Sequence, residues 1–84
     1  MPTPTLPVLE ATAAAIDVGS EQLHTSIAGG PPKIFGTTTG ELHALRNYFL
    51  ARGVRSVAME ATGIYWLCPY EVLEKAGLAV VVVN

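Results

Sequence analysis

The sequence predicts a small α/β protein built on one mixed β-sheet. The prediction rests on the short length, the high apolar content and a hydrophobic period that changes from two residues to a helical repeat along the chain. The chain has 84 residues, of which 50% are hydrophobic and 14% are charged. That composition supports one core and argues against disorder of the whole chain.

Simple counts exclude membrane-spanning and disulfide-rich classes. The longest uncharged apolar run near the end, residues 78–83, is far shorter than the about 20 residues that cross a bilayer. No secretory signal is evident at the start, and the single cysteine, Cys68, cannot form an internal disulfide. We therefore expect a cytoplasmic protein that makes no contact with a membrane.

The charge balance argues against a free-standing nucleic-acid binder. Five Lys and Arg residues against seven Asp and Glu residues give a net charge of -2, whereas such a binder usually carries a basic footprint. Only Arg46, Arg52 and Arg55 lie close enough in the sequence to come near to forming a basic cluster. If the protein acts on nucleic acid, most of the grip on phosphates must come from elsewhere.

The first part of the chain predicts a tail and three strands. Prolines at positions 2, 4 and 7 prevent a sustained helix or ladder, so residues 1–12 are expected to form a disordered tail and residues 13–84 the domain. Apolar and alternating runs then predict three strands, with a Gly-Gly-Pro-Pro turn before the last of them: residues 13–18, 23–28 and 33–37.

A helix is predicted after these strands. Thr38 and Glu41 have the spacing of a capping box, in which Glu41 reaches back to the backbone of Thr38. Gly53 is a natural helix stop. Between them, apolar residues at helical spacing form one stripe that should face the core: Leu42, Leu45, Phe49 and Leu50.

The rest of the chain predicts a strand, a helix and a final strand. Residues 54–59 form a short apolar run that ends at Glu60, and residues 62–76 have a helical pattern interrupted by Pro69, which predicts a kink or a late start. Residues 78–83 are continuously apolar, which is typical of a strand covered on both faces. The chain supplies only two helices, so part of that cover is expected to be missing. The same run is uncharged, β-branched and free of proline, a composition that favours edge-to-edge association.

The resulting order, β-β-β-α-β-α-β, restricts the topology. Strand–helix–strand connections are right-handed and make their two strands parallel. The economical sheet keeps the first three strands antiparallel and docks the fourth beside the first, which gives the spatial order 3-2-1-4-5. This is the ribonuclease H-like arrangement.

Two acids stand out within this arrangement. Asp17 interrupts the apolar run of the first strand, and Glu60 ends that of the fourth. A carboxylate pressed into apolar surroundings loses hydration and needs a cation or hydrogen-bond donors. If the two strands are parallel neighbours, both side chains meet at one edge of the sheet, where oxygen ligands could hold Mg²⁺. Glu60 could instead complement the N-terminus of the following helix.

Local sequence strings resemble one family. Residues 16–20 (IDVGS) resemble the opening of ribonuclease H-like domains in general, and residues 60–66 (EATGIYW) are much more specific. Together with residues 35–37 (FGT) and 80–84, they resemble the N-terminal DEDD, or RuvC-like, domain of the IS one-ten family of insertion-sequence transposases. The resemblance covers residues 14–84 and departs from the family pattern at Cys68, where a proline is usual.

The resemblance implies a DNA recombinase that moves an insertion sequence. Such enzymes work with DNA and a guide RNA, are expected to be homo-oligomers, and hold magnesium with four acids in the order Asp-Glu-Asp-Asp. Asp17 and Glu60 match the first two acids, as catalytic and metal-binding residues. The other two acids, and a separate domain with a serine nucleophile, would follow Asn84, so the resemblance implies a C-terminally truncated chain that is inactive alone.

Two alternatives remain open. The Asp-Val-Gly-Ser string also resembles the first phosphate loop of sugar kinases and actin-like ATPases. That resemblance leaves the string at residues 60–66 unexplained. The chain could also be a non-catalytic remnant that binds a full-length relative.

Other chemically notable side chains favour structural roles. His24 and His43 lack a partner at a zinc-ligand spacing and are expected at the surface. The aromatic residues Tyr65, Trp66 and Tyr70 could stack on bases, but their helical spacing favours core or subunit contacts. Cys68 lies in the same apolar helix and is expected to be a small core residue.

Overall fold

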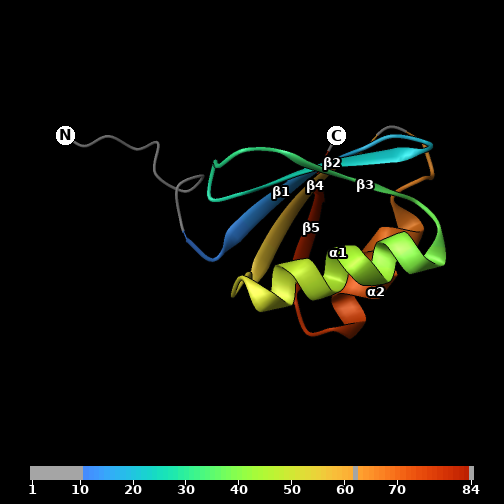
Figure 1. Ribbon diagram of the computed structural model, residues 1–84. Helices are drawn as coiled ribbons and strands as arrows, with labels where there is room; N and C mark the ends of the chain where they lie inside the picture. The colour runs from blue at the N-terminus through green and yellow to red at the C-terminus, as the bar shows by residue number, and fades with distance from the viewer. Residues whose placement is uncertain (1–10, 62, 84) are drawn as a thin grey trace.

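The computed structural model describes residues 11–61 and 63–83, which form five strands and two helices (Figure 1). The elements are β1 (Ala13–Val18), β2 (Gln22–Ile27), β3 (Lys33–Gly36), α1 (Thr39–Ala51), β4 (Ser56–Ala61), α2 (Leu67–Lys75) and β5 (Ala79–Val83). The expected tail lies outside the described residues except for its last two positions. Thr12 is held, because its carbonyl oxygen accepts the backbone N–H groups of Arg55 at 2.7 Å and Ser56 at 3.2 Å.

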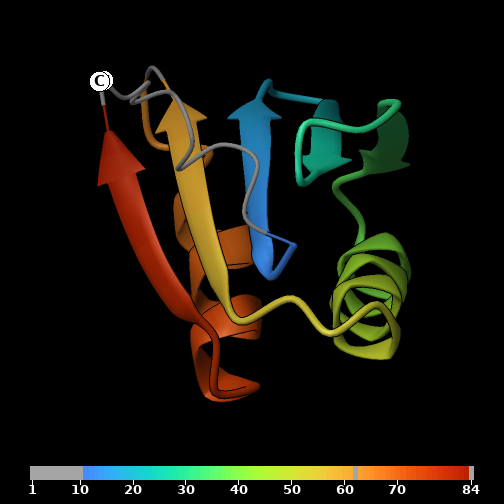
Figure 2. The ribbon, with the colours of Figure 1, turned by 90° about the vertical axis from the view of Figure 1, so that its left-hand side faces the viewer.

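The strands form one mixed sheet in the order β3-β2-β1-β4-β5 (Figure 2). The first three strands are antiparallel neighbours along the chain. β1 pairs in parallel with β4, and β4 pairs in parallel with β5. β4 and β5 are joined through α2 in a strand–helix–strand connection, whereas the chain passes from β1 to β4 by way of β2, β3 and α1.

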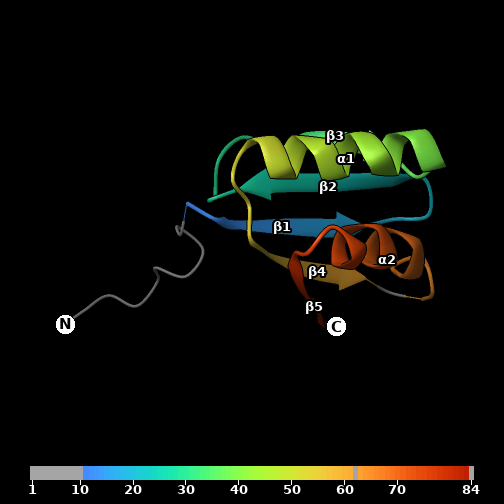
Figure 3. The same ribbon diagram turned by 90° about the horizontal axis from the view of Figure 1, so that it is seen from below.

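Both helices pack on the same face of the sheet, α1 along β2 and β3 and α2 along β1 and β4 (Figure 3). Between this face and the helices lies one core, to which every strand but β5 contributes a buried apolar side chain. Its fully buried large residues are Ile16, Leu23, Leu45, Phe49, Met59 and Leu73. The opposite face of the sheet, which we call the open face, carries no helix within the described residues.

The capping of α1 differs from the expected capping box. Thr38 is the N-cap, and its hydroxyl accepts the backbone N–H of Glu41 at 3.3 Å. The carboxylate of Glu41 does not return to Thr38; it accepts the backbone N–H of Gly36 at 2.8 Å. Gly36 permits this contact because a Cβ there would lie only 3.2 Å from Cγ of Glu41. The side chain therefore ties the helix to the end of β3.

The core stripe of α1 is narrower than expected. Leu42, Leu45 and Phe49 are buried, but Leu50 is 46% exposed. At 100° per residue, Leu50 lies about 100° around the helix from Phe49 and so outside the buried face, and no element within residues 11–61 and 63–83 buries it. Its expected place in the core was wrong.

The strand β4 and the helix α2 are both displaced from the predicted bounds. β4 continues through Glu60 to Ala61, so Glu60 lies inside the strand instead of ending it. α2 starts late, at Leu67, after turns at residues 63–66. Pro69 is thus the third residue of the helix, where the N–H that proline lacks would have no partner inside the helix. The late start that Pro69 predicted is confirmed.

The last strand is covered on one face only. Val81 is 60% exposed and Val83 is 44% exposed on the open face, while Val80 and Val82 pack partly against the core. Part of the cover that this apolar run calls for is therefore missing within the described residues, as expected for a chain with two helices. A continuous run of valines reads as doubly buried, yet the open face of β5 meets no packing element.

Candidate functional site

The two acids singled out in the sequence occupy matching positions on neighbouring strands. Asp17 is the fifth residue of β1, Glu60 is the fifth residue of β4, and the two are direct partners in the parallel register. Adjacent strands lie about 4.8 Å apart. The expectation that the two acids lie side by side near the carboxyl ends of adjacent parallel strands is therefore confirmed, although each strand continues for one further residue.

Both acids lie on the open face and are exposed. In β1 the buried side chains are Ala14, Ile16 and Val18, so Asp17 points to the other side of the sheet. The same alternation in β4 buries Met59 and exposes Glu60. The expectation of desolvated carboxylates was wrong, because alanines on the open face made an alternating strand look continuously apolar.

His24 of β2 completes a row across the sheet that the sequence analysis did not identify. His24 is the register partner of Asp17 in the antiparallel β1–β2 pair. Asp17 in turn pairs with Glu60 of β4, and Glu60 pairs with Val83 of β5. These four residues line one shallow depression on the open face. His24 is exposed, as expected, but it is a direct neighbour of the acid pair.

The register could have indicated this neighbour. A hairpin that closes on the turn between Val18 and Leu23 must place Asp17 opposite His24, since each step along one strand is matched by a step along the other. The turn is closed by a hydrogen bond from the N–H of Gly19 to the carbonyl of Gln22 at 2.9 Å.

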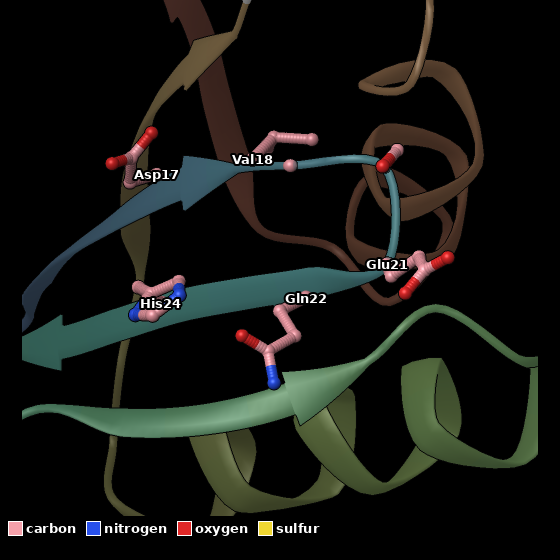
Figure 4. Close-up of a pocket in the computed structure, with 7 residues that line it drawn as sticks. Asp17, Val18, Glu21, Gln22 and His24 are labelled. Carbon is pink, nitrogen blue, oxygen red and sulfur yellow. The ribbon is translucent and has the colours of Figure 1, made fainter.

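A second depression lies over this β1–β2 turn (Figure 4). Asp17 and His24 line one end of it, and Glu21 and Gln22 line the other. Its lining holds two carboxylates and no lysine or arginine. A cation is electrostatically favoured over a phosphate group in such a depression.

The aromatic residues after Glu60 divide into two groups. Trp66 and Tyr70 pack edge to face, with ring centroids 5.7 Å apart, and both contact the core, as expected. Tyr65 is 54% exposed and so lies outside the core, which leaves a subunit contact as the other role expected for it. Cys68 is also exposed, which overturns its predicted place in the core. Both placements have one cause: residues 63–66 form turns, so the helical phase starts later than the pattern suggested.

The acid pair suits a hard divalent cation in part. Two carboxylates on rigid neighbouring strands offer oxygen ligands, and magnesium commonly takes one or two carboxylates and keeps several waters. No group of three or more His, Cys, Asp or Glu side chains that could hold a metal occurs within residues 11–61 and 63–83. The described residues thus present a pair of ligands rather than a closed cage.

Charge is separated along the strand direction. Four acids gather at the carboxyl end of the parallel strands: Asp17, Glu21, Glu41 and Glu60. Three basic residues lie at the opposite end, where helices end or strands begin: Arg52, Arg55 and Lys75. Glu74, in the last turn of α2, is an acid at this basic end.

Comparison with known proteins gives no family assignment. No protein-family model matches the chain, and no curated protein matches it. Neither of the two helices of the described chain is long and apolar enough to cross a membrane.

Proposed function

We propose that this chain is the first part of a ribonuclease H-like, RuvC-like domain of an insertion-sequence transposase of the IS one-ten type. Asp17 and Glu60 contribute to a magnesium site for DNA transposition, and the chain is inactive by itself. The observation that carries the proposal is the direct register pairing of the two acids on adjacent parallel strands.

The arrangement around the acids supports the proposal. The open face leaves both carboxylates accessible to a large substrate, while Ile16 and Met59 anchor the two strands in the core behind them. The carboxylates are therefore held by rigid elements, as a site for positioned ligands requires. The resemblance of residues 60–66 to the family motif points to Glu60, and the resemblance of residues 16–20 points to Asp17.

The division of chemical work follows from these positions. A magnesium ion, when bound, would supply positive charge to polarise a phosphodiester oxygen. Asp17 and Glu60 would orient that ion through their oxygens, and the bare face beside them would admit the substrate. The chain supplies little charge for gripping phosphate at this end of the sheet, where acids gather. DNA and guide RNA would accordingly be held mainly by other parts of a homo-oligomeric full-length protein.

Magnesium titration of the 84-residue chain, followed by nuclear magnetic resonance, tests the site. We expect weak magnesium binding that shifts the signals of residues around Asp17 and Glu60. Asp17→Asn and Glu60→Gln should each weaken this binding further. Glu71→Gln is the matched control, since it removes one exposed acid from α2, which packs on the face of the sheet opposite to Asp17 and Glu60. Shifts that persist unchanged in both site variants, or that respond equally to the control, would refute the assignment.

An actin-like ATPase or sugar kinase is the second candidate, because the β1–β2 turn that such proteins use for phosphate also forms a depression here. The lining of this depression holds two carboxylates and no lysine or arginine, which weighs against a phosphate ligand. The same titration with ATP in place of magnesium separates the candidates. Shifts centred on Gly19 and Ser20 with ATP would favour the ATPase.

A further inference from the structure

We propose that β5 is a self-pairing edge, through which two copies of this chain form a dimer with one continuous sheet. β5 lies at the end of the sheet and pairs only with β4 among the described strands. An edge strand presents a row of backbone N–H and C=O groups that can pair with another strand. The inference concerns this edge and does not depend on the chemistry of the acid pair.

The two edges of the sheet differ in how they are protected. β3 has only four residues, follows two prolines and begins with a lysine, Lys33. Short length, proline and lysine are features that discourage edge pairing. β5 has five residues, all alanine or valine, with no charge and no proline. Of the two edge strands in the described part of the chain, β5 is therefore the unprotected one.

A second copy of the same strand fits this edge. A two-fold axis normal to the sheet would place β5 antiparallel to its copy, with each residue pairing reciprocally. Since β5 is uncharged, this pairing brings no like charges together within the strand, and valine on valine is a favourable cross-strand pair. The helices of both copies would lie on the same side of the joined sheet.

The protection of β3 limits the assembly to two copies. A dimer formed through β5 has only the two β3 strands at its outer edges, and each carries the proline pair and Lys33. An isologous interface closes on itself, whereas a heterologous one extends into filaments. We therefore expect a reversible dimer without larger species.

Sedimentation equilibrium of the whole chain over a range of concentrations tests this inference. The average mass should rise from 8.9 kDa towards twice that value. Val81, at the centre of β5 and 60% exposed, is the position to change. Val81→Lys places two lysines near the axis and should raise the dissociation constant by about tenfold or more. Val81→Thr keeps a neutral β-branched residue and should leave dimerisation nearly unchanged.

Ala58→Lys is the matched control. Ala58 is the register partner of Val81, is exposed on the same open face, and lies one strand inside the edge. Edge pairing predicts that only Val81→Lys dissociates the dimer. Stacking of two open faces would make both lysine variants monomeric, and this result would overturn the inference, as would a chain that is monomeric at every concentration. Circular dichroism checks that each variant is folded.

Hydrogen exchange gives a measurement that needs no variant. Backbone amides of β5 that point away from β4 should exchange more slowly as the concentration of the chain rises, whereas amides of β3 should not change. Equal protection at all concentrations would contradict the pairing of β5.

Discussion

Glu41 in the first turn of α1 accepts the backbone N–H of Gly36, the last residue of β3, at 2.8 Å. The contact joins a helix to the strand that precedes it across a two-residue connection. It also places a carboxylate at the positive end of the helix dipole, which is favourable. One side chain thus fixes the angle at which the chain leaves the sheet.

Removal of this contact should destabilise the domain. We expect Glu41→Ala to lower the free energy of unfolding by about 1–2 kcal/mol, from the lost hydrogen bond and the lost dipole interaction. Glu41→Gln keeps an acceptor oxygen and should cost about half as much. Urea unfolding measures both. Glu74→Gln removes an acid from the last turn of α2, where the dipole is reversed, and should be neutral or slightly stabilising.

Two glycines of α1 and its end should respond in opposite ways to alanine. Gly40 is helical, and a Cβ there would meet nothing within 4 Å, so Gly40→Ala should stabilise the protein by about 0.4–1 kcal/mol. Gly53 has φ +76°, a left-handed backbone conformation in which a residue with a Cβ is strained. Gly53→Ala should therefore destabilise the protein by about 1 kcal/mol. Equal effects of the two changes on the melting temperature would contradict this assignment.

The stability of the protein should respond strongly to alanine at one position of α1 and hardly at all at the next. Phe49 is fully buried, and Phe49→Ala should cost about 3–5 kcal/mol, a large part of the stability of a small domain. Leu50→Ala should change stability by less than about 0.5 kcal/mol, since Leu50 is exposed. Thermal melts compare the two variants directly. A large loss in Leu50→Ala would show that this side chain is covered in solution.

The acid pair should reduce stability when no cation is present. Asp17 and Glu60 are like charges in direct register, which is unfavourable. At pH 8 and low salt, Asp17→Asn should raise the melting temperature by about 1–3 °C, as expected for a few tenths of a kcal/mol in a domain of this size. The gain should shrink as salt is added. A gain that salt leaves intact would point to a cause other than repulsion.

The exposure of Cys68 can be checked chemically. Because the thiol is at the surface, a disulfide reagent should modify the native chain at a rate similar to that of the chain unfolded in urea. Protection of the native thiol by a large factor would support the core position that the sequence suggested.

The class of the fold could be predicted because apolar periodicity fixes it. Alternation in Leu23, Thr25 and Ile27 identified a strand with one buried face, and the stripe through Leu42, Leu45 and Phe49 identified a helix. The parallel pairing of β1 with β4 followed from keeping the first three strands antiparallel and docking the fourth beside the first. These features depend on local pattern and on a general rule of chain geometry.

Other features depended on contacts that sequence spacing does not show. Alanines at 13–15 conceal which face of β1 is buried, so Asp17 was expected in apolar surroundings and is exposed. The turns at residues 63–66 shift the phase of the following helix, which moved Tyr65 and Cys68 to the surface. His24 joins the acid pair only through the register of a hairpin. The first two errors came from local patterns with two readings, and only the place of His24 depended on how one strand is placed against another.

The separation of charge along the strands gives the molecule an electric dipole moment. Asp17, Glu21, Glu41 and Glu60 form its negative end, and Arg52, Arg55 and Lys75 form most of its positive end. Near a highly charged polyanion the field exerts a torque that turns the basic end forward and the acid pair away. A divalent cation held at the acid pair, as proposed, would weaken this torque. The orientation in which such a polymer meets the molecule would then vary with the divalent-ion concentration of the solution.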